Sequence, residues 1–165
     1  MVKVIITCGK VCSGKTTYAK SLCKEQRAVL LSVDEAMLTI FGNDAGQMHD
    51  EYTERIKAYL KKSAAEAAKN GINVVMDWGL WTKRERNEIR AYFHEKGIEF
   101  EIHYLEIDGL EWKRRIGKRN EELIKNGGNE AYYVDEGLLD KCISLFEEPD
   151  NEEIDVWIKC KAEGV

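Results

Sequence analysis

The sequence contains no long apolar run: no uninterrupted stretch approaches the roughly 20 residues that a helix needs to cross a bilayer, and the chain does not start with a basic segment followed by an apolar one. We therefore expect a cytoplasmic protein with no membrane partner. The sequence also lacks an excess of basic residues, because 30 Asp and Glu outnumber 25 Lys and Arg and give a formal net charge of −5. Affinity for nucleic acid comes largely from Lys and Arg that neutralise phosphates, so this balance argues against nucleic acid as the main partner, although a local basic patch would still suffice.

Cysteine patterns of the kind that bind zinc are missing as well. The cysteines form no C-x-x-C pair, and no histidine stands at a zinc-site spacing; they are Cys8, Cys12, Cys23, Cys142 and Cys160. We expect reduced thiols that are mostly packed. Repeats, linkers and low-complexity segments are also absent, so the sequence predicts one domain, residues 1–165, long enough to bury a core without staples.

Short apolar runs alternate with helical patterns along the chain. The runs at 2–6, 28–33 and 72–76 are typical of strands buried in a parallel sheet, while alternation at 100–107 predicts a strand nearer an edge and alternation at 154–158 a last strand. Helical spacing covers 16–25, 52–67, 82–95, 110–125 and 134–147, and the most flexible-looking stretch is 125–130. Strands that alternate with helices imply an α/β fold: a three-layer α/β/α sandwich with a mostly parallel sheet of about five strands.

Residues 9–16 read G-K-V-C-S-G-K-T and match the phosphate-binding pattern G-x-x-x-x-G-K-[ST], between a strand-like run and a helical pattern. The glycines let backbone N–H groups turn inward and the following helix adds its positive end, so the loop favours bound phosphate. Lys15 would reach the β and γ phosphates of ATP, and the Thr16 hydroxyl would bind Mg²⁺. The alternative is a glycine-rich turn between core elements. The predicted nucleotide-binding residues are Gly9, Lys10, Val11, Cys12, Ser13, Gly14, Lys15, Thr16 and Thr17.

The motifs of other P-loop classes are not found. A guanine-specific switch would carry an N-K-x-D element and a D-x-x-G loop, and the sequence has neither. Motors of the larger ATPase classes need a longer chain. The size class that remains is that of the small kinases.

Two carboxylates follow predicted strands. Asp34 lies just beyond the second strand, where an open α/β sheet places its ligands, and could accept the proton of a substrate hydroxyl; alternatively it caps a helix that begins at Glu35. Asp77 ends an apolar strand and has the form of a Walker B carboxylate that orients Mg²⁺, or of an ordinary turn or cap residue. Trp78 and Trp81 come next and would wall an acceptor pocket or simply pack.

A basic helix follows the fourth strand. Arg115 and Arg119 are four residues apart and so lie on one helix face, with Arg114 and Lys118 beside them. This pattern suits a lid, at about 112–133, whose arginines stabilise the charge of a transferring phosphoryl group. The alternative is a solvated charged face answered by Glu111, Glu121 and Glu122.

These motifs together resemble the small P-loop kinases related to polynucleotide 5′-kinase, zeta toxin and chloramphenicol phosphotransferase, and especially the bacterial stand-alone kinases of that group. The similarity covers nearly the whole chain and rests on the P-loop, on S-x-D at 32–34, on "VVMDWGLW" followed by Arg86, on "WKRRIGKRN" and on "LFEEPDNEE". The resemblance implies a P-loop NTPase fold with a helical lid, Asp34 as general base, Lys15 and Thr16 on phosphate and Mg²⁺, and Arg115 and Arg119 as lid arginines.

Some residues stay open even with the resemblance. Arg86 is similar to a family arginine near the acceptor or the phosphates, but a surface ion pair with nearby glutamates would fit equally well. The segment Phe146–Glu153 has no role that the sequence supplies. The histidines match no motif, so packing or surface roles are expected for His49, His94 and His103.

The leading hypothesis is an ATP- and Mg²⁺-dependent phosphotransferase that moves the γ phosphate to a hydroxyl of a small molecule. One alternative is a polynucleotide 5′-hydroxyl kinase, for which the basic helix argues weakly. An alternative of another class is a nucleotide-binding or ATPase signalling protein that has no phosphorylated acceptor. A protein partner cannot be inferred from the sequence.

Overall fold

A computed structural model describes residues 2–42, 45–126 and 131–160. Five strands form one sheet in the order β2-β3-β1-β4-β5, and every neighbouring pair is parallel. The strands are β1 (Val4–Cys8), β2 (Val29–Ser32), β3 (Val74–Asp77), β4 (Phe100–Ile107) and β5 (Val156–Cys160). The predicted α/β fold with a mostly parallel sheet is therefore confirmed, and the described sheet is wholly parallel.

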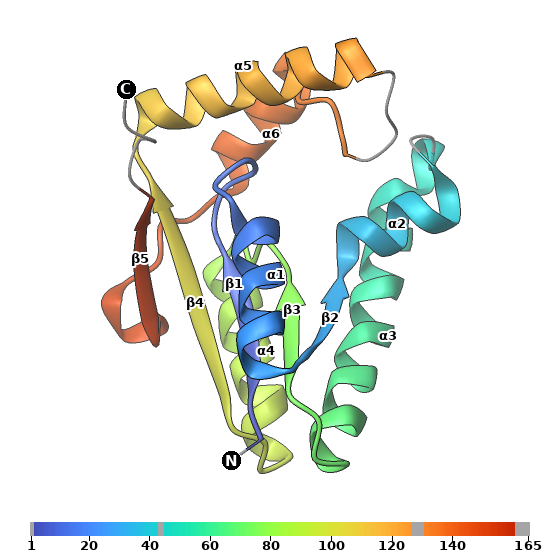
Figure 1. The fold of residues 1–165 in the computed structure, drawn as a ribbon, viewed down its shortest axis with the longest axis vertical. Helices are drawn as coiled ribbons and strands as arrows, with labels where there is room; N and C mark the ends of the chain where they lie inside the picture. The colour runs from blue at the N-terminus through green and yellow to red at the C-terminus, as the bar shows by residue number, and fades with distance from the viewer. Residues whose placement is uncertain (1, 43–44, 127–130, 161–165) are drawn as a thin grey trace.

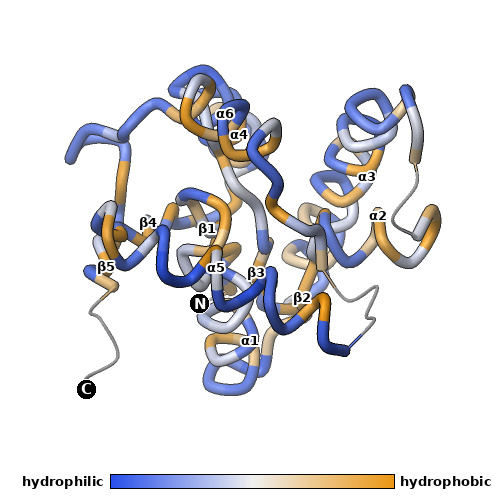
Figure 2. Tube along the Cα trace, turned by 90° about the horizontal axis from the view of Figure 1, so that it is seen from above, coloured by the Kyte–Doolittle hydropathy of each residue, from blue (hydrophilic) through white to orange (hydrophobic). Residues whose placement is uncertain are grey.

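Helices cover both faces of this sheet and one of its ends (Figure 1). Seen from above, α1 lies on one side of the strands and α3 and α4 lie on the other (Figure 2). Helix α5 crosses above the carboxyl ends of the strands, where ligands bind in open α/β sheets. The helices are α1 (Lys15–Gln26), α2 (Val33–Phe41), α3 (His49–Lys69), α4 (Lys83–Glu95), α5 (Gly109–Asn126) and α6 (Glu136–Leu145), with 3₁₀ turns η1 (Gly46–Met48) and η2 (Asn151–Glu153).

Strand β1 shows how the two layers divide the core. Its five residues are all buried, and successive side chains point to opposite faces because a strand has a period of two. Val4 and Ile6 join the cluster under α3 and α4, whereas Ile5 packs with Ala19 and Leu22 of α1. The three-layer arrangement that the sequence predicts follows from this alternation.

The position of β4 agrees with the sequence interpretation. The alternating pattern of 100–107 predicted a strand nearer an edge, and β4 is the second strand from the edge that β5 forms. β5 pairs only with His103–Ile107, so Phe100–Ile102 has β1 as its only strand neighbour within the described sheet.

Helices α5 and α6 follow β4 in the chain, and the predicted lid, at about 112–133, begins within α5. The predicted helix 110–125 is present as α5, while the predicted helix 134–147 is shorter, because the Asp135 side chain caps α6 by accepting from the Leu138 N–H. Of the stretch expected to be flexible, residues 127–130 lie outside the described residues. None of the described helices is long and apolar enough to cross a membrane.

Candidate active site

The loop between β1 and α1 has the backbone of a phosphate cradle. Gly9 has φ 146°, and a Cβ there would lie 2.9 Å from the Leu105 carbonyl oxygen; Gly14, with φ 99°, stands at the N-cap of α1. Neither position tolerates a side chain without strain. The alternative of an ordinary turn is therefore disfavoured, and the loop suits a bound phosphate at the positive end of α1.

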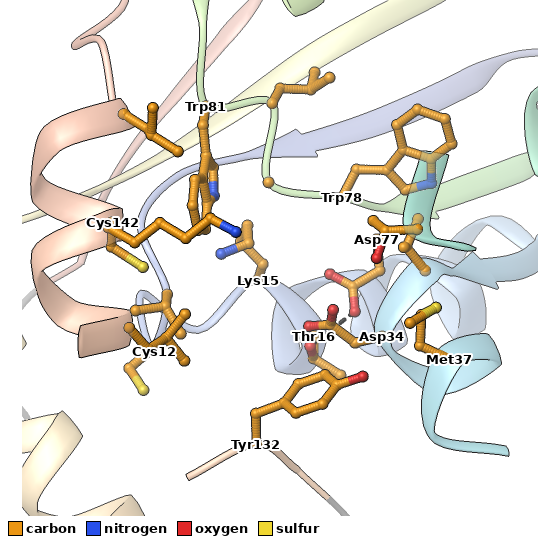
Figure 3. A pocket seen from close by; sticks show the side chains of 18 of the residues that line it. Cys12, Lys15, Thr16, Asp34, Met37, Asp77, Trp78, Trp81, Tyr132 and Cys142 are labelled. Atoms are coloured by element: carbon orange, nitrogen blue, oxygen red, sulfur yellow. Dashed lines mark hydrogen bonds between the residues drawn. The ribbon is translucent and has the colours of Figure 1, made fainter. Parts of the chain in front are cut away.

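Lys15 lies in the cavity that opens above this loop (Figure 3). Its ammonium group donates to the Lys10 carbonyl oxygen at 2.6 Å. Burial lowers the pKa of Lys15, and the charges of Asp77 and Asp34 oppose that effect. An anionic ligand at this loop would therefore stabilise the charged form of Lys15.

Thr16 and Asp77 form a pair of oxygen donors. The Thr16 hydroxyl donates to Asp77 Oδ2 at 2.7 Å, and the Ser32 hydroxyl approaches the same oxygen at 3.3 Å. Asp77 ends β3 and is buried, so the sheet fixes its position. A hydroxyl and a carboxylate at this spacing are the kind of ligands that Mg²⁺ takes from proteins, so these residues fit the predicted metal.

Asp34 does not cap α2. Ser32 does, because its hydroxyl accepts from the Glu35 N–H at 3.3 Å, and the helix begins at Val33. The cap interpretation of Asp34 is therefore wrong, and its side chain lies in the cavity beside Thr16 and Asp77 (Figure 3). The Asp34 side chain is exposed to the solvent that fills the cavity. The surrounding walls nevertheless desolvate its carboxylate and raise its pKa, and the charge of Lys15 opposes this shift.

Helix α5 is fastened to the phosphate loop. The Trp112 indole N–H donates to the Val11 carbonyl at 2.6 Å, Arg115 Nη1 donates to the Ser13 carbonyl at 3.1 Å, and Arg119 Nη1 lies 3.3 Å from the Cys12 sulfur. Arg119 Nε is buried and has no hydrogen-bond partner among the described residues. The arginine face of α5 therefore borders the site, as the lid interpretation requires.

Glu111 anchors that arginine face from below. Its buried carboxylate accepts from Arg114 at 2.7 Å and from Arg115 at 2.6 Å. These hydrogen bonds lower the pKa of Glu111 to about 2. Glu111 is one of the acids named in the solvated-face alternative. Because its carboxylate is buried, it orients the arginines instead of pairing with them at a solvated surface.

Trp78 and Trp81 line the cavity, whereas Arg86 does not. Arg86 is 1% exposed and donates to both carboxylate oxygens of Glu153, at 3.2 and 3.3 Å, and to the Leu80 carbonyl at 3.1 Å. Both the acceptor role and the surface ion pair are therefore wrong for Arg86. Its partner comes from 67 residues further along the chain, a contact that local spacing does not reveal.

The segment 146–153 ties the site together. Glu148 accepts from Lys10 and from the Tyr104 hydroxyl, both at 2.5 Å, and Glu153 holds Arg86. The Glu147 N–H donates to the Trp81 carbonyl at 2.8 Å. These contacts give the segment a structural role: it fixes the phosphate loop and the turn that carries both tryptophans.

The sequence missed several residues of the cavity wall. His49 and Tyr132 lie edge to face with ring centroids 5.6 Å apart, and the Tyr132 hydroxyl is buried and unpartnered within the described residues. Neither residue belongs to a motif, so no local signal could have identified them. The same holds for Asp50, Glu54, Lys57, Glu85, Lys141 and Cys142.

The cysteines and His103 have the roles that the sequence predicts. All five cysteines are free; Cys8 and Cys142 are buried and the others are partly buried, which agrees with the expected reduced thiols. His103 is buried and contacts the Tyr18 hydroxyl at 2.8 Å, a packing role as expected. No group of three or more potential metal-binding acids, cysteines or histidines occurs among residues 2–42, 45–126 and 131–160.

Several solved structures resemble this chain in fold, and one family model matches its sequence. Among solved structures, APS kinase CysC of Mycobacterium tuberculosis, in complex with AMPPNP and APS, is 17% identical over 98% of this chain and 90% of that chain, with a TM-score of 0.68. A gluconokinase of Sinorhizobium meliloti 1021 is 14% identical over 97% and 83%, with a TM-score of 0.65. A chain of the Pnkp1/Rnl/Hen1 RNA repair complex is 21% identical over 87% and 43%, with a TM-score of 0.69.

These identities are low, so the solved structures show the fold alone. No curated protein matches the sequence significantly. The model of the family described as AAA domain matches residues 4–149, which is well over half of the chain. The chain therefore belongs to the AAA domain family and has the P-loop kinase-like fold, as the motifs predicted.

Proposed function

We propose that the protein transfers the γ phosphate of ATP to a hydroxyl group of a small molecule in the presence of Mg²⁺. The observation that carries this proposal is the position of Asp34. Because Ser32 caps α2, Asp34 is free to face the cavity that also holds Lys15 and Thr16. A carboxylate in that place can take a proton from an attacking hydroxyl.

The donor side would be formed by the phosphate loop and by α5. Backbone N–H groups of the loop, Lys15 and Arg119 would bind the phosphates, and Thr16 and Asp77 would hold Mg²⁺. The metal, when bound, supplies positive charge next to the phosphate oxygens. The described residues then contribute positioning and charge neutralisation, without a covalent intermediate on the protein.

On the acceptor side, Asp34 would receive the proton as the acceptor oxygen bonds to the γ phosphorus. The bond from that phosphorus to the bridging oxygen breaks, and ADP leaves with its electron pair. The raised pKa of Asp34 makes its carboxylate a stronger base than an ordinary aspartate. This division of labour is common to kinases that use an aspartate as the base.

The size of the cavity supports a small acceptor, because its volume of about 840 Å³ includes the phosphate-binding loop and is shared between the phosphates of ATP and the acceptor. The similarity in fold to an APS kinase and a gluconokinase supports the same class. The net charge of −5 argues against a long nucleic-acid acceptor, so we place the polynucleotide 5′-kinase alternative second.

The test is transfer of label from γ-labelled ATP, with Mg²⁺, to small-metabolite extract and to 5′-hydroxyl oligonucleotides, for the native protein, Asp34→Asn and Glu35→Gln. Glu35 is the exposed neighbour of Asp34 on α2 and does not line the cavity. We expect label in the small-molecule fraction for the native protein and Glu35→Gln, and a loss of roughly 10²-fold or more for Asp34→Asn.

Other results would point elsewhere. Label in the oligonucleotides would select the polynucleotide kinase. Label released only as free phosphate, equally in all three proteins, would reject the base role of Asp34 and favour the ATPase or signalling alternative.

A further inference from the structure

The acceptor end of the cavity carries more carboxylates than lysines. The Lys141 ammonium lies 2.9 Å from Asp50, and the Lys57 ammonium lies 2.9 Å from Glu54 and 2.8 Å from Glu85. Each lysine there already has a carboxylate partner. The acidic residues of this end are Asp34, Asp50, Glu54 and Glu85, against Lys57 and Lys141.

Lys57 and Glu85 of this cluster are both ionised. Burial would lower the pKa of Lys57, but its hydrogen bonds to Glu85 and Glu54 outweigh burial and raise it. Burial likewise opposes ionisation of Glu85, yet the bond to Lys57 keeps the pKa of Glu85 below its ordinary value. One ammonium between two carboxylates leaves a net charge of −1 on the cluster.

A small chamber continues the cavity behind this cluster. Its volume is about 110 Å³, and Glu54, Lys57 and Glu85 line both spaces together with Trp78 and Leu80. Lys61 and Glu88 complete the charged part of its wall, and Glu88 is already paired with Arg84 at 2.6 Å. The chamber has room for an amino group beside the two carboxylates of the Lys57 cluster.

Trp78 provides an independent sign of a ligand at this place. The side chain is 6% exposed, and its indole N–H has no hydrogen-bond partner among the described residues. A buried donor without a partner costs free energy, which a bound oxygen atom would recover.

We infer that the acceptor is an amine-bearing alcohol, such as an amino sugar or an amino alcohol, whose ammonium group binds beside Glu54 and Glu85 while one of its oxygens accepts from Trp78. This inference rests on the proposed function and names its substrate class. A cleft whose wall carries excess charge of one sign concentrates ligands of the opposite sign and disfavours ligands of its own. The phosphate-binding end, with Lys15, Lys118 and Arg119, has the opposite character.

The first test separates the substrate class from the activity itself. A small-metabolite extract is divided beforehand by ion exchange at neutral pH into cationic, neutral and anionic pools, and each is incubated with the protein, γ-labelled ATP and Mg²⁺. We expect label in the cationic pool, roughly tenfold or more above the other two. Label mainly in the neutral or anionic pool would overturn this inference and leave the proposed phosphotransferase standing.

If no pool takes label, and phosphate release is equal in the native protein and Asp34→Asn, the proposed function fails and this inference falls with it.

The second test uses Glu85→Gln. Glutamine can replace glutamate in the capping box that Glu85 forms with Thr82, so the change removes the charge and keeps the cap. For the acceptor isolated from the cationic pool we expect KM to rise roughly tenfold, with kcat and the KM for ATP changed less than about twofold. Glu95→Gln, an exposed change on the same helix away from both spaces, is the control. An unchanged KM for the acceptor in a folded Glu85→Gln protein would reject the amine site.

Discussion

Asp34, the proposed base, carries a cost to the stability of the unliganded fold. Its pKa is raised above the ordinary value of 3.8, so the folded protein binds a proton there more tightly than the unfolded chain does. The stability that this site contributes therefore falls as pH rises from the ordinary pKa through the raised one. At neutral pH the ionised side chain costs stability that the charge of Lys15 offsets only in part, a familiar exchange of stability for activity.

Replacement of Asp34 by asparagine should therefore stabilise the protein while it abolishes transfer. We expect a higher Tm for Asp34→Asn at pH 8, and a difference that shrinks as the pH is lowered toward 4. Thermal unfolding without nucleotide, at several pH values, measures this. A lower Tm at pH 8 would mean that the carboxylate makes a contact on which the fold depends.

Thr16 and Asp77 show why part of the site could be predicted from the sequence. Each belongs to a local pattern: Thr16 closes the phosphate loop, and Asp77 ends an apolar strand next to β1 in the sheet. Parallel strands bring their carboxyl ends to one edge, so the two side chains had to lie near each other. His49 and Tyr132 belong to no such pattern, and only the tertiary packing brings them to the cavity.

Helix α4 is held to the segment 146–153 by a buried ion pair. Arg86 and Glu153 are 1% and 8% exposed, and removal of one partner would leave the other charge buried without compensation. We expect Glu153→Ala to lower the free energy of unfolding by about 3–5 kcal/mol, as measured by urea denaturation. Glu152→Ala, a change at the exposed neighbour, should cost little. Equal effects of the two changes would show that the pair is not needed to hold α4.

We expect the face of α5 that borders the cavity to contribute more to activity than its exposed face. We expect Arg119→Ala to lower kcat by roughly 10²–10³-fold, the size of effect seen when one donor to a transition-state oxygen is removed, with a smaller loss of ATP affinity. Lys113→Ala, on the exposed side of the same helix, should leave both nearly unchanged. Steady-state kinetics and nucleotide titration measure the two effects. Similar losses in both variants would mean that α5 matters for folding and not for the phosphates.

Elements were easier to predict than the contacts between them. The strand and helix periods of the sequence identified every described strand and all but the short helix α2. A cap at Asp34 was one of two interpretations of that residue, and Ser32 is the residue that caps α2. A serine before an acidic pair allows either residue to cap, and only the backbone decides. The bond of Arg86 to Glu153 spans 67 residues, a separation that no helical or strand period encodes.

Binding of nucleotide should stabilise the whole molecule, because the loop, α5 and the strand ends all contribute to one cavity. A ligand at 100 times its Kd adds about 2.7 kcal/mol, which corresponds to roughly 5–10 °C in Tm here. We expect that shift with ATP and Mg²⁺, and its loss in Lys15→Ala but not in Lys20→Ala, an exposed lysine on α1. Thermal shift assays with and without Mg²⁺ provide the measurement. No shift in the native protein would contradict nucleotide binding.

The order of the strands also has a consequence for synthesis on the ribosome. β1 is made before the other strands but lies in the middle of the sheet, between β3 and β4. β4 begins at Phe100, so at translation rates of about 5–20 residues per second the mostly apolar β1 waits roughly 5–20 s for its second neighbour. During that interval β1 is an aggregation-prone strand of the nascent chain, because at least one of its edges has no partner strand. Slow translation between β1 and β4 should therefore make this chain more dependent on chaperones, whereas a pause after Ile107 should not.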